Sequence, residues 1–186
     1  MIKKSNVEYN GETFKLEGKE IQEKETRAKD LAGYFLDSAA YQQLDPETLM
    51  YRVEFQDNGL VEGTPGGLYF GITHLCPGVV GEEYFLTKGH FHAKRDTGEY
   101  YFGLQGHGLL MMTENGETQL EAVVPGSVHY IPGNTAHRLI NTGTGMLSIS
   151  ACWQIESGHD YLPSEEMFPQ RVLRDTTGVP IIKMNP

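Results

Sequence analysis

The sequence has no apolar run that approaches the ~18 residues of a membrane-spanning helix. It has only two cysteines, Cys76 and Cys152, far apart in apolar contexts. This favours two buried thiols in a reducing compartment over a disulfide framework. Polar residues rather than an apolar signal core follow Met1. We therefore expect a cytoplasmic protein with no membrane partner.

Positive charge is also scarce. Lys and Arg total 15 against 25 Asp and Glu, which gives a formal net charge of -10. Proteins that bind nucleic acid usually present a basic surface, and an acidic chain has few cations with which to form one. This charge balance therefore argues against nucleic acid as a partner. A small anionic ligand would need local cations.

Glycine, in contrast, is abundant, with 22 of 186 residues, while hydrophobic residues make up 39% and aromatic residues 10%. This composition favours a globular, turn-rich β protein. The length suits one domain and is too short for two ordinary ones. We predict a single domain over 1–186, with an N-terminal extension (1–45), a barrel core (46–163) and a C-terminal appendage (164–186).

Short runs rich in β-branched and aromatic residues follow one another from residue 50, separated by turn sequences such as Glu114-Asn115-Gly116. They predict strands over 50–55, 68–75, 83–92, 99–104, 109–113, 119–124, 127–131, 137–141 and 146–153. Residues 19–44 favour one or two short helical pieces. So many strands at short spacing predict a closed barrel or a sandwich, because closure removes exposed strand edges.

Two histidines, His90 and His92, lie one residue apart in a predicted strand. Side chains at i and i+2 of a strand point the same way, so both imidazoles can reach one metal. Glu99 begins the next predicted strand, where a hairpin return can set its carboxylate opposite the histidines. His137 begins a further strand after the turn 132–136. These four residues predict a site for a divalent first-row metal rather than Ca²⁺ or Mg²⁺.

Other polar residues receive a structural interpretation. We interpret three histidines as satisfied, half-buried rings and three cations as solvated surface groups: His74, His107 and His129, and Lys94, Arg95 and Arg138.

The metal-site residues resemble the two motifs of the cupin superfamily. The matching positions are His90, His92, Glu99 and Gly106, then Gly126, Pro132, His137 and Asn141. The six-residue gap before Glu99 is similar to that of a narrower family, the cupin-type glucose-6-phosphate isomerases. The signature of that family resembles Pro77-x3-Gly81-x-Glu83-x3-Thr87-x-Gly89-His90-x-His92-x6-Glu99-x-Tyr101. The chain departs from the family pattern at Asn134 and Trp153, where tyrosines are expected, and at Gly133, where the pattern has a second proline.

The resemblance implies an all-β cupin barrel, a double-stranded β-helix or jelly roll, with short N-terminal helical segments. It implies a homodimer that interconverts glucose 6-phosphate and fructose 6-phosphate in glycolysis and gluconeogenesis. One divalent metal per chain is expected, Fe²⁺ before Mn²⁺, Zn²⁺, Ni²⁺ or Co²⁺, held by His90, His92, Glu99 and His137. The catalytic candidates are Glu99, Tyr101 and His159. The substrate-binding candidates are Thr73, Thr87, Gly89, Lys88, Tyr51 and Tyr161.

Strand parity conflicts with one of these assignments. On a regular strand that turns His90 and His92 inward, Lys88 also faces inward and Thr87 faces outward. Gly89 can reset the alternation, because glycine within a strand often marks a bulge.

Three functions are compatible with this site. The first is a metal-dependent isomerase, by an enediol route or a hydride shift. The second is an oxygenase, since three histidines and a glutamate can also hold Fe²⁺. The third is a sugar-binding cupin without catalysis.

Overall fold

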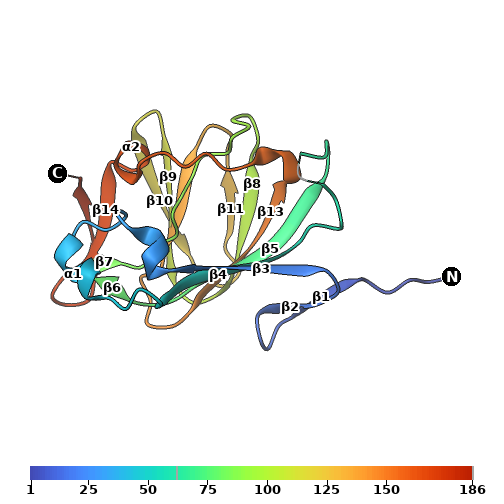
Figure 1. Ribbon diagram of the computed structural model, residues 1–186, viewed down its shortest axis with the longest axis horizontal. Coiled ribbons are helices and arrows are strands. Elements are labelled where there is room, and N and C mark those ends of the chain that lie inside the picture. Colours follow the sequence, from blue (N-terminus) through green and yellow to red (C-terminus); the bar gives the residue numbers. More distant parts are fainter. Residues whose placement is uncertain (62, 186) are drawn as a thin grey trace.

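The computed structural model describes residues 1–61 and 63–185, in which strands dominate (Figure 1). The strands are β1 (Val7–Asn10), β2 (Lys15–Gly18), β3 (Ile21–Arg27), β4 (Leu49–Gln56), β5 (Leu68–Leu75), β6 (Val79–Val80), β7 (Glu83–Tyr84), β8 (Glu99–Gln105), β9 (Gly108–Glu114), β10 (Glu117–Val123), β11 (Val128–Ile131), β12 (Ala136–Ile140), β13 (Leu147–Gln154), β14 (Gln170–Arg174) and β15 (Pro180–Met184). The helical elements are η1 (Ala28–Leu31), α1 (Ser38–Gln43), η2 (Ile155–Ser157) and α2 (Ser164–Met167).

Antiparallel sheets form the walls of a β-barrel. A six-stranded sheet has the order β11-β8-β13-β5-β4-β3, and a three-stranded sheet has the order β10-β9-β12. A third sheet, β15-β14-β7-β6, closes one end of the molecule (Figure 1). The inner faces enclose one hydrophobic core that includes Leu110, Ile131 and Ile149. The prediction of an all-β barrel with short N-terminal helical segments is confirmed.

The strand and turn predictions hold best where the sequence alternates regularly. β5 has the predicted bounds, Leu68–Leu75. β9 and β10 form a hairpin in which Glu114 pairs with Glu117. Asn115 and Gly116 form its tip with φ of 51° and 80°, as a two-residue turn of this type requires.

Two segments differ from the prediction. The expected strand 83–92 is regular only at Glu83–Tyr84, and beyond it the chain makes isolated bridges to β12 and to Asp160. Gly89, at a φ of +71°, interrupts the strand conformation. Residues 21–27 form strand β3 instead of helix, because pairing with β4 outweighs local helix propensity.

Both ends of the chain contribute to the barrel. β3 is an edge strand of the six-stranded sheet, and Leu31 of η1 is buried in the core. From the C-terminal segment, Phe168 and Val172 also lie in the core. No helix in the described part of the chain is long and apolar enough to cross a membrane.

A polar cluster is buried in the six-stranded sheet. The His74 ring lies 2.8 Å from the Glu54 carboxylate and 2.9 Å from the Ser148 hydroxyl. The Nδ1 of His129 lies 2.6 Å from the Glu121 carboxylate. These two histidines are satisfied and more deeply buried than predicted.

Three other predicted environments differ. His107 is exposed rather than half-buried, because it lies in the turn between β8 and β9. Cys76 and Cys152 are free but only half-buried, so they are not the fully buried thiols expected from their apolar neighbours.

The outer face of the same sheet exposes large apolar side chains from β5, β8 and β11, with β13 lying between β5 and β8. They are Leu68, Phe70, Tyr100, Phe102, Val128 and Tyr130, and we call this set the apolar sheet face.

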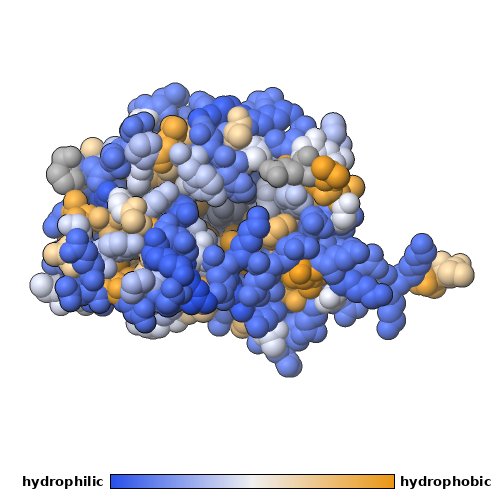
Figure 2. Space-filling model, in the orientation of Figure 1, coloured by the Kyte–Doolittle hydropathy of each residue, from blue (hydrophilic) through white to orange (hydrophobic). Residues whose placement is uncertain are grey.

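The face of the molecule seen in Figure 2 is largely hydrophilic and is hollowed near its centre.

Candidate active site and metal centre

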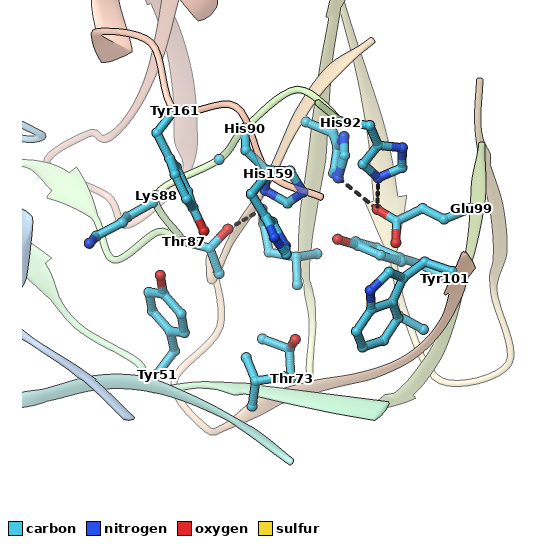
Figure 3. A pocket seen from close by; sticks show the side chains of 16 residues that line it. Tyr51, Thr73, Thr87, Lys88, His90, His92, Glu99, Tyr101, His159 and Tyr161 are labelled. Carbon is cyan, nitrogen blue, oxygen red and sulfur yellow. Dashed lines mark hydrogen bonds and ion pairs between the residues drawn. The ribbon is translucent and has the colours of Figure 1, made fainter. Parts of the chain in front are cut away.

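His90, His92, Glu99 and His137 converge inside the barrel. One potential ligand atom from each lies within 4.8 Å of those of the other three. β8 begins at Glu99, and β12 carries His137 opposite His90, to which it bridges. Figure 3 shows the Glu99 carboxylate pointing at the His92 imidazole. The structure thus brings together all four predicted ligands.

Backbone carbonyls orient two of the imidazoles. The Nδ1 of His92 lies 2.8 Å from the Thr97 carbonyl oxygen, and the Nδ1 of His137 lies 3.1 Å from that of Thr135. An Nδ1–H that donates to a carbonyl leaves the Nε2 lone pair free as a ligand. Both Nε2 atoms point at Oε1 of Glu99, at 3.5 Å and 2.6 Å.

The donor set fits a metal ion. The buried Nε2 of His137 and Oε1 of Glu99 have no hydrogen-bond partner among the described residues, despite their close approach. Burial, together with the electrostatic effect of the neighbouring His137 and His159 rings, lowers the pKa of His90 well below its ordinary value. Burial alone would raise the pKa of Glu99, but His137 and His92 outweigh it and lower that pKa. A neutral imidazole and an ionised carboxylate are the forms that bind metals.

A cavity of about 130 Å³ extends from these four residues. It is smaller than the ~300–1,000 Å³ of sites for drug-sized ligands, so it suits a small metabolite. Besides the metal-site residues, its lining consists of Tyr51, Val53, Thr73, Thr87, Lys88, Gly89, Tyr101, Leu139, Ala151, Trp153, His159 and Tyr161. Every predicted site residue is therefore in this cavity.

Thr87, Lys88 and Gly89 form the wall beyond the histidines. The Thr87 hydroxyl oxygen accepts a hydrogen bond from the Leu139 amide at 3.0 Å, so its own proton remains available to a ligand. The Lys88 ammonium lies 6.0 Å from the Tyr161 ring centre. Because Gly89 has a positive φ, Thr87, Lys88 and His90 all reach the cavity, which resolves the parity conflict.

Tyrosines line both ends of the cavity (Figure 3). Burial raises the pKa of Tyr51 to about 12. Burial and the neighbouring Glu99 carboxylate raise the pKa of Tyr101 well above its ordinary value. Both side chains are therefore neutral hydroxyl groups at physiological pH. Tyr161 stacks on His159, with ring centres 5.7 Å apart and planes within 5°.

The apolar cavity walls were not predicted from the sequence. Val53 follows Tyr51 by two residues on β4, and Ala151 precedes Trp153 by two on β13. Strand alternation from Tyr51 and Trp153 is the signal that identifies these neighbours. Asn134, in contrast, does not line the cavity and occupies a turn at a φ of +58°.

The three cations predicted at the surface have different surroundings. Lys94 is exposed, as predicted, and pairs with Glu156 at 2.6 Å; Arg95 is half-exposed and pairs with Asp160. Arg138 is buried, so the surface interpretation of this residue is wrong. β12 lies between β9 and the segment 86–90, and all five of its residues are covered. Burial lowers the pKa of Arg138 to about 9, which still leaves it charged at neutral pH.

Comparison with known proteins identifies the family. A family model described as "Glucose-6-phosphate isomerase (GPI)" matches residues 25–170. The chain belongs to the glucose-6-phosphate isomerase family. The glucose-6-phosphate isomerase of Thermococcus kodakarensis is 39% identical over 165 residues, which cover 86% of this chain and 84% of that protein. That of Pyrococcus horikoshii is 39% identical over 163 residues, which cover 84% and 83%.

Among solved structures, oxalate decarboxylase from Bacillus subtilis matches 59% of this chain and 26% of its own, at 16% identity and a TM-score of 0.46. The family relatives confirm the resemblance seen in residues 77–101, and with it the prediction of an enzyme of the glucose-6-phosphate isomerase family.

Proposed function

We propose that the chain interconverts glucose 6-phosphate and fructose 6-phosphate in the cavity described above. The observation that carries this proposal is the placement of two kinds of group in one small cavity. A metal-binding cluster lies at one end, and hydroxyl groups with a lysine lie at the other. A phosphosugar needs both, one for its C1 and C2 oxygens and one for its phosphate.

In this mechanism Glu99 transfers a proton between C2 and C1 of the sugar. Its contacts with His92 and His137 both use Oε1, which leaves Oε2 to accept the proton. A divalent metal held by the three histidines and Glu99 supplies Lewis-acid stabilisation of the charge that develops on O1 and O2. Tyr101 and His159 complete the proposed catalytic set as hydrogen-bonding groups beside the reacting carbons.

The phosphate is proposed to bind at Thr87, Lys88 and Gly89, with further contacts from Thr73. Thr87 offers a hydroxyl proton and Lys88 a positive charge. Tyr51 and Tyr161 are assigned to the sugar hydroxyls between the two ends. This arrangement separates binding of the phosphate from chemistry at C1 and C2.

Fe²⁺ is the proposed metal, with Mn²⁺, Zn²⁺, Ni²⁺ and Co²⁺ as alternatives. Three imidazoles and one carboxylate support a first-row divalent ion. This donor set does not distinguish among these ions, so the one that binds depends on which is available. The proposal places the enzyme in the cytoplasm, in glycolysis and gluconeogenesis, as a single-domain chain.

A homodimer is also part of the proposal, with the apolar sheet face as its contact surface. The six exposed residues of this face carry no charge. Those of β8 and β11 lie on paired strands, and Cys152 of β13 lies between Tyr100 and Phe70 of β5. A second copy of the same face is apolar too, so the two copies bury each other without desolvating an ion.

Metal add-back in a coupled assay tests the proposed activity. Protein stripped with a chelator is expected to lose fructose 6-phosphate conversion and to regain it with Fe²⁺ or a related ion. The circular dichroism spectrum should not change, because the barrel has its own core. Full activity in verified metal-free protein would contradict the proposal. Substrate-dependent oxygen uptake without isomerisation would instead favour an oxygenase, and binding without turnover at any metal loading would favour a sugar-binding cupin.

A further inference from the structure

Arg138 is a buried cation whose direct partners are all neutral. Its side chain is 1% exposed, and it donates to the Ser164 hydroxyl at 3.1 Å and to the Gln170 carbonyl at 3.3 Å. Its guanidinium carbon lies 4.2 Å from the ring centre of Phe168. Its Nε has no partner among the described residues. No carboxylate makes direct contact with this charge in the contacts described.

The carboxylate whose charge reaches Arg138 is already paired with another arginine. Glu83 attracts Arg138 through space, but its oxygens lie 3.0 Å and 3.3 Å from the guanidinium of Arg171. Glu83 also accepts a hydrogen bond from the Leu36 amide at 2.9 Å. Arg138, Arg171 and Glu83 together therefore carry two positive charges and one negative charge, which leaves an excess of one positive charge.

The base of the Arg138 side chain lies behind the wall of the cavity. A Cβ atom placed on Gly89 would lie 2.6 Å from the Phe168 ring and 2.9 Å from Cβ of Arg138. The other side of the Gly89 backbone lines the cavity. The Phe168 ring that approaches Gly89 also lies 4.2 Å from the guanidinium carbon of Arg138, so the charge packs against the back of this wall.

We infer that Arg138 acts through the wall as a buried positive charge that strengthens binding of the substrate phosphate. This inference rests on the proposed function, which places the phosphate at Thr87–Gly89. A charge buried without an ionic partner is costly to fold, so its presence beside an anion site calls for a compensating role. The whole chain carries a net charge of -10, which repels a phosphate dianion. A cation in apolar surroundings is little screened by salt and offsets that repulsion locally.

Neutral substitutions of Arg138 test this role. Arg138→Met keeps most of the length of the side chain, and Arg138→Gln keeps an amide donor for the Gln170 carbonyl. Each is expected to raise the inhibition constant of inorganic phosphate and the KM for fructose 6-phosphate by about tenfold. The kcat and metal content should stay near those of the wild type. Arg138→Lys should retain most of the phosphate affinity, because it keeps the charge.

Arg174→Met is the matched control, since it removes one positive charge at an exposed position. Its effect on phosphate inhibition should be small and should vanish in high salt, whereas the effect of Arg138→Met should persist. Thermal melting of each variant verifies folding. An unchanged inhibition constant in a folded neutral variant would overturn the inference. Equal losses in the Lys and Met variants would also overturn it, because shape rather than charge would then matter.

Thr87→Val separates this inference from the proposed function. If Thr87→Val weakens phosphate inhibition and the Arg138 variants do not, the phosphate site is retained and only the buried charge is rejected. If Thr87→Val and Lys88→Met both leave phosphate inhibition unchanged, the proposed phosphate site itself is wrong.

Discussion

Glu99 has two proposed roles, metal ligand and proton carrier, that one substitution can separate. Glu99→Gln keeps the size of the side chain and one oxygen donor but removes the basic carboxylate. The three histidines should still hold the metal, more weakly, while turnover falls by about 100-fold or more, as is usual when a general base is lost. Elemental analysis and kcat measured on the same preparation check this expectation.

Hydrogen exchange distinguishes the two routes at the same residue. In an enediol route the wild type exchanges the C2 hydrogen with solvent, and the metal-loaded Gln variant does not. Near-normal turnover in a fully metallated Gln variant, with hydrogen passing between C2 and C1 without exchange, would leave Glu99 as a ligand only and favour a hydride shift.

Single residues also show where sequence reasoning succeeds and where it fails. His90, His92, Glu99 and His137 were predictable because their spacing is set by local strand and turn geometry. The buried position of Arg138 was not predictable. It depends on the segment 164–170, which is distant in sequence and folds over β12. The roles assigned to the cavity residues stay predictions.

At the scale of the element, the segment around Gly89 determines the shape of the cavity wall. Alanine at this position would have a φ of +71°, and its Cβ would overlap the Phe168 ring and approach Cβ of Arg138. We expect Gly89→Ala to lower the free energy of unfolding by about 1–3 kcal/mol or more. It should also raise the KM for fructose 6-phosphate, because the Thr87–Gly89 backbone must move. Denaturant unfolding and steady-state kinetics measure the two effects.

Gly116→Ala is the control for backbone strain alone. Its φ is +80°, but nothing lies within 4 Å of the added Cβ. It should cost about 1 kcal/mol in stability and leave KM unchanged. Equal stability losses in the two variants, with no change in KM for Gly89→Ala, would show that contact with Phe168 does not hold the cavity wall.

The same element explains why some strands were predictable and others were not. β5 and the β9–β10 hairpin follow from alternation and turn residues, which act locally. The predicted strand 83–92 is regular only to Tyr84, and within its irregular part the positive φ of Gly89 changes which side chains face the cavity. β3 is stabilised by its pairing with β4, a contact that local propensity does not encode.

At the scale of the whole molecule, the apolar sheet face predicts the oligomeric state. The wild type should sediment at twice the chain mass of 20.8 kDa. Phe102→Lys should shift it toward the monomer, because an unpaired charge in the contact opposes association. Ile182→Lys, at an exposed position on β15 in a separate sheet, should leave the mass unchanged. A monomeric wild type, or a Phe102→Lys variant that remains a dimer, would contradict the proposed contact.

Stability of the whole molecule should fall on mild acidification, in part through His74. Burial lowers the pKa of His74 below 6.5 in the folded protein, although Glu54 partly opposes this. The unfolded chain then binds more protons than the folded one as the pH falls below 6.5. The stabilisation from the neutral ring is therefore complete above 6.5 and is lost as the pH falls toward the folded pKa. Denaturant unfolding at about pH 7.5 and about pH 5.5 should show this loss.

His74→Gln should reduce the difference in unfolding free energy between the two pH values, because it removes this titrating group. It will also lower stability at both, since the buried contacts with Glu54 and Ser148 are altered. His107→Gln, at an exposed position, should leave the difference as in the wild type. If His74→Gln and the wild type lose equal stability on acidification, the pH dependence arises from other groups, and His74 contributes through its hydrogen bonds alone.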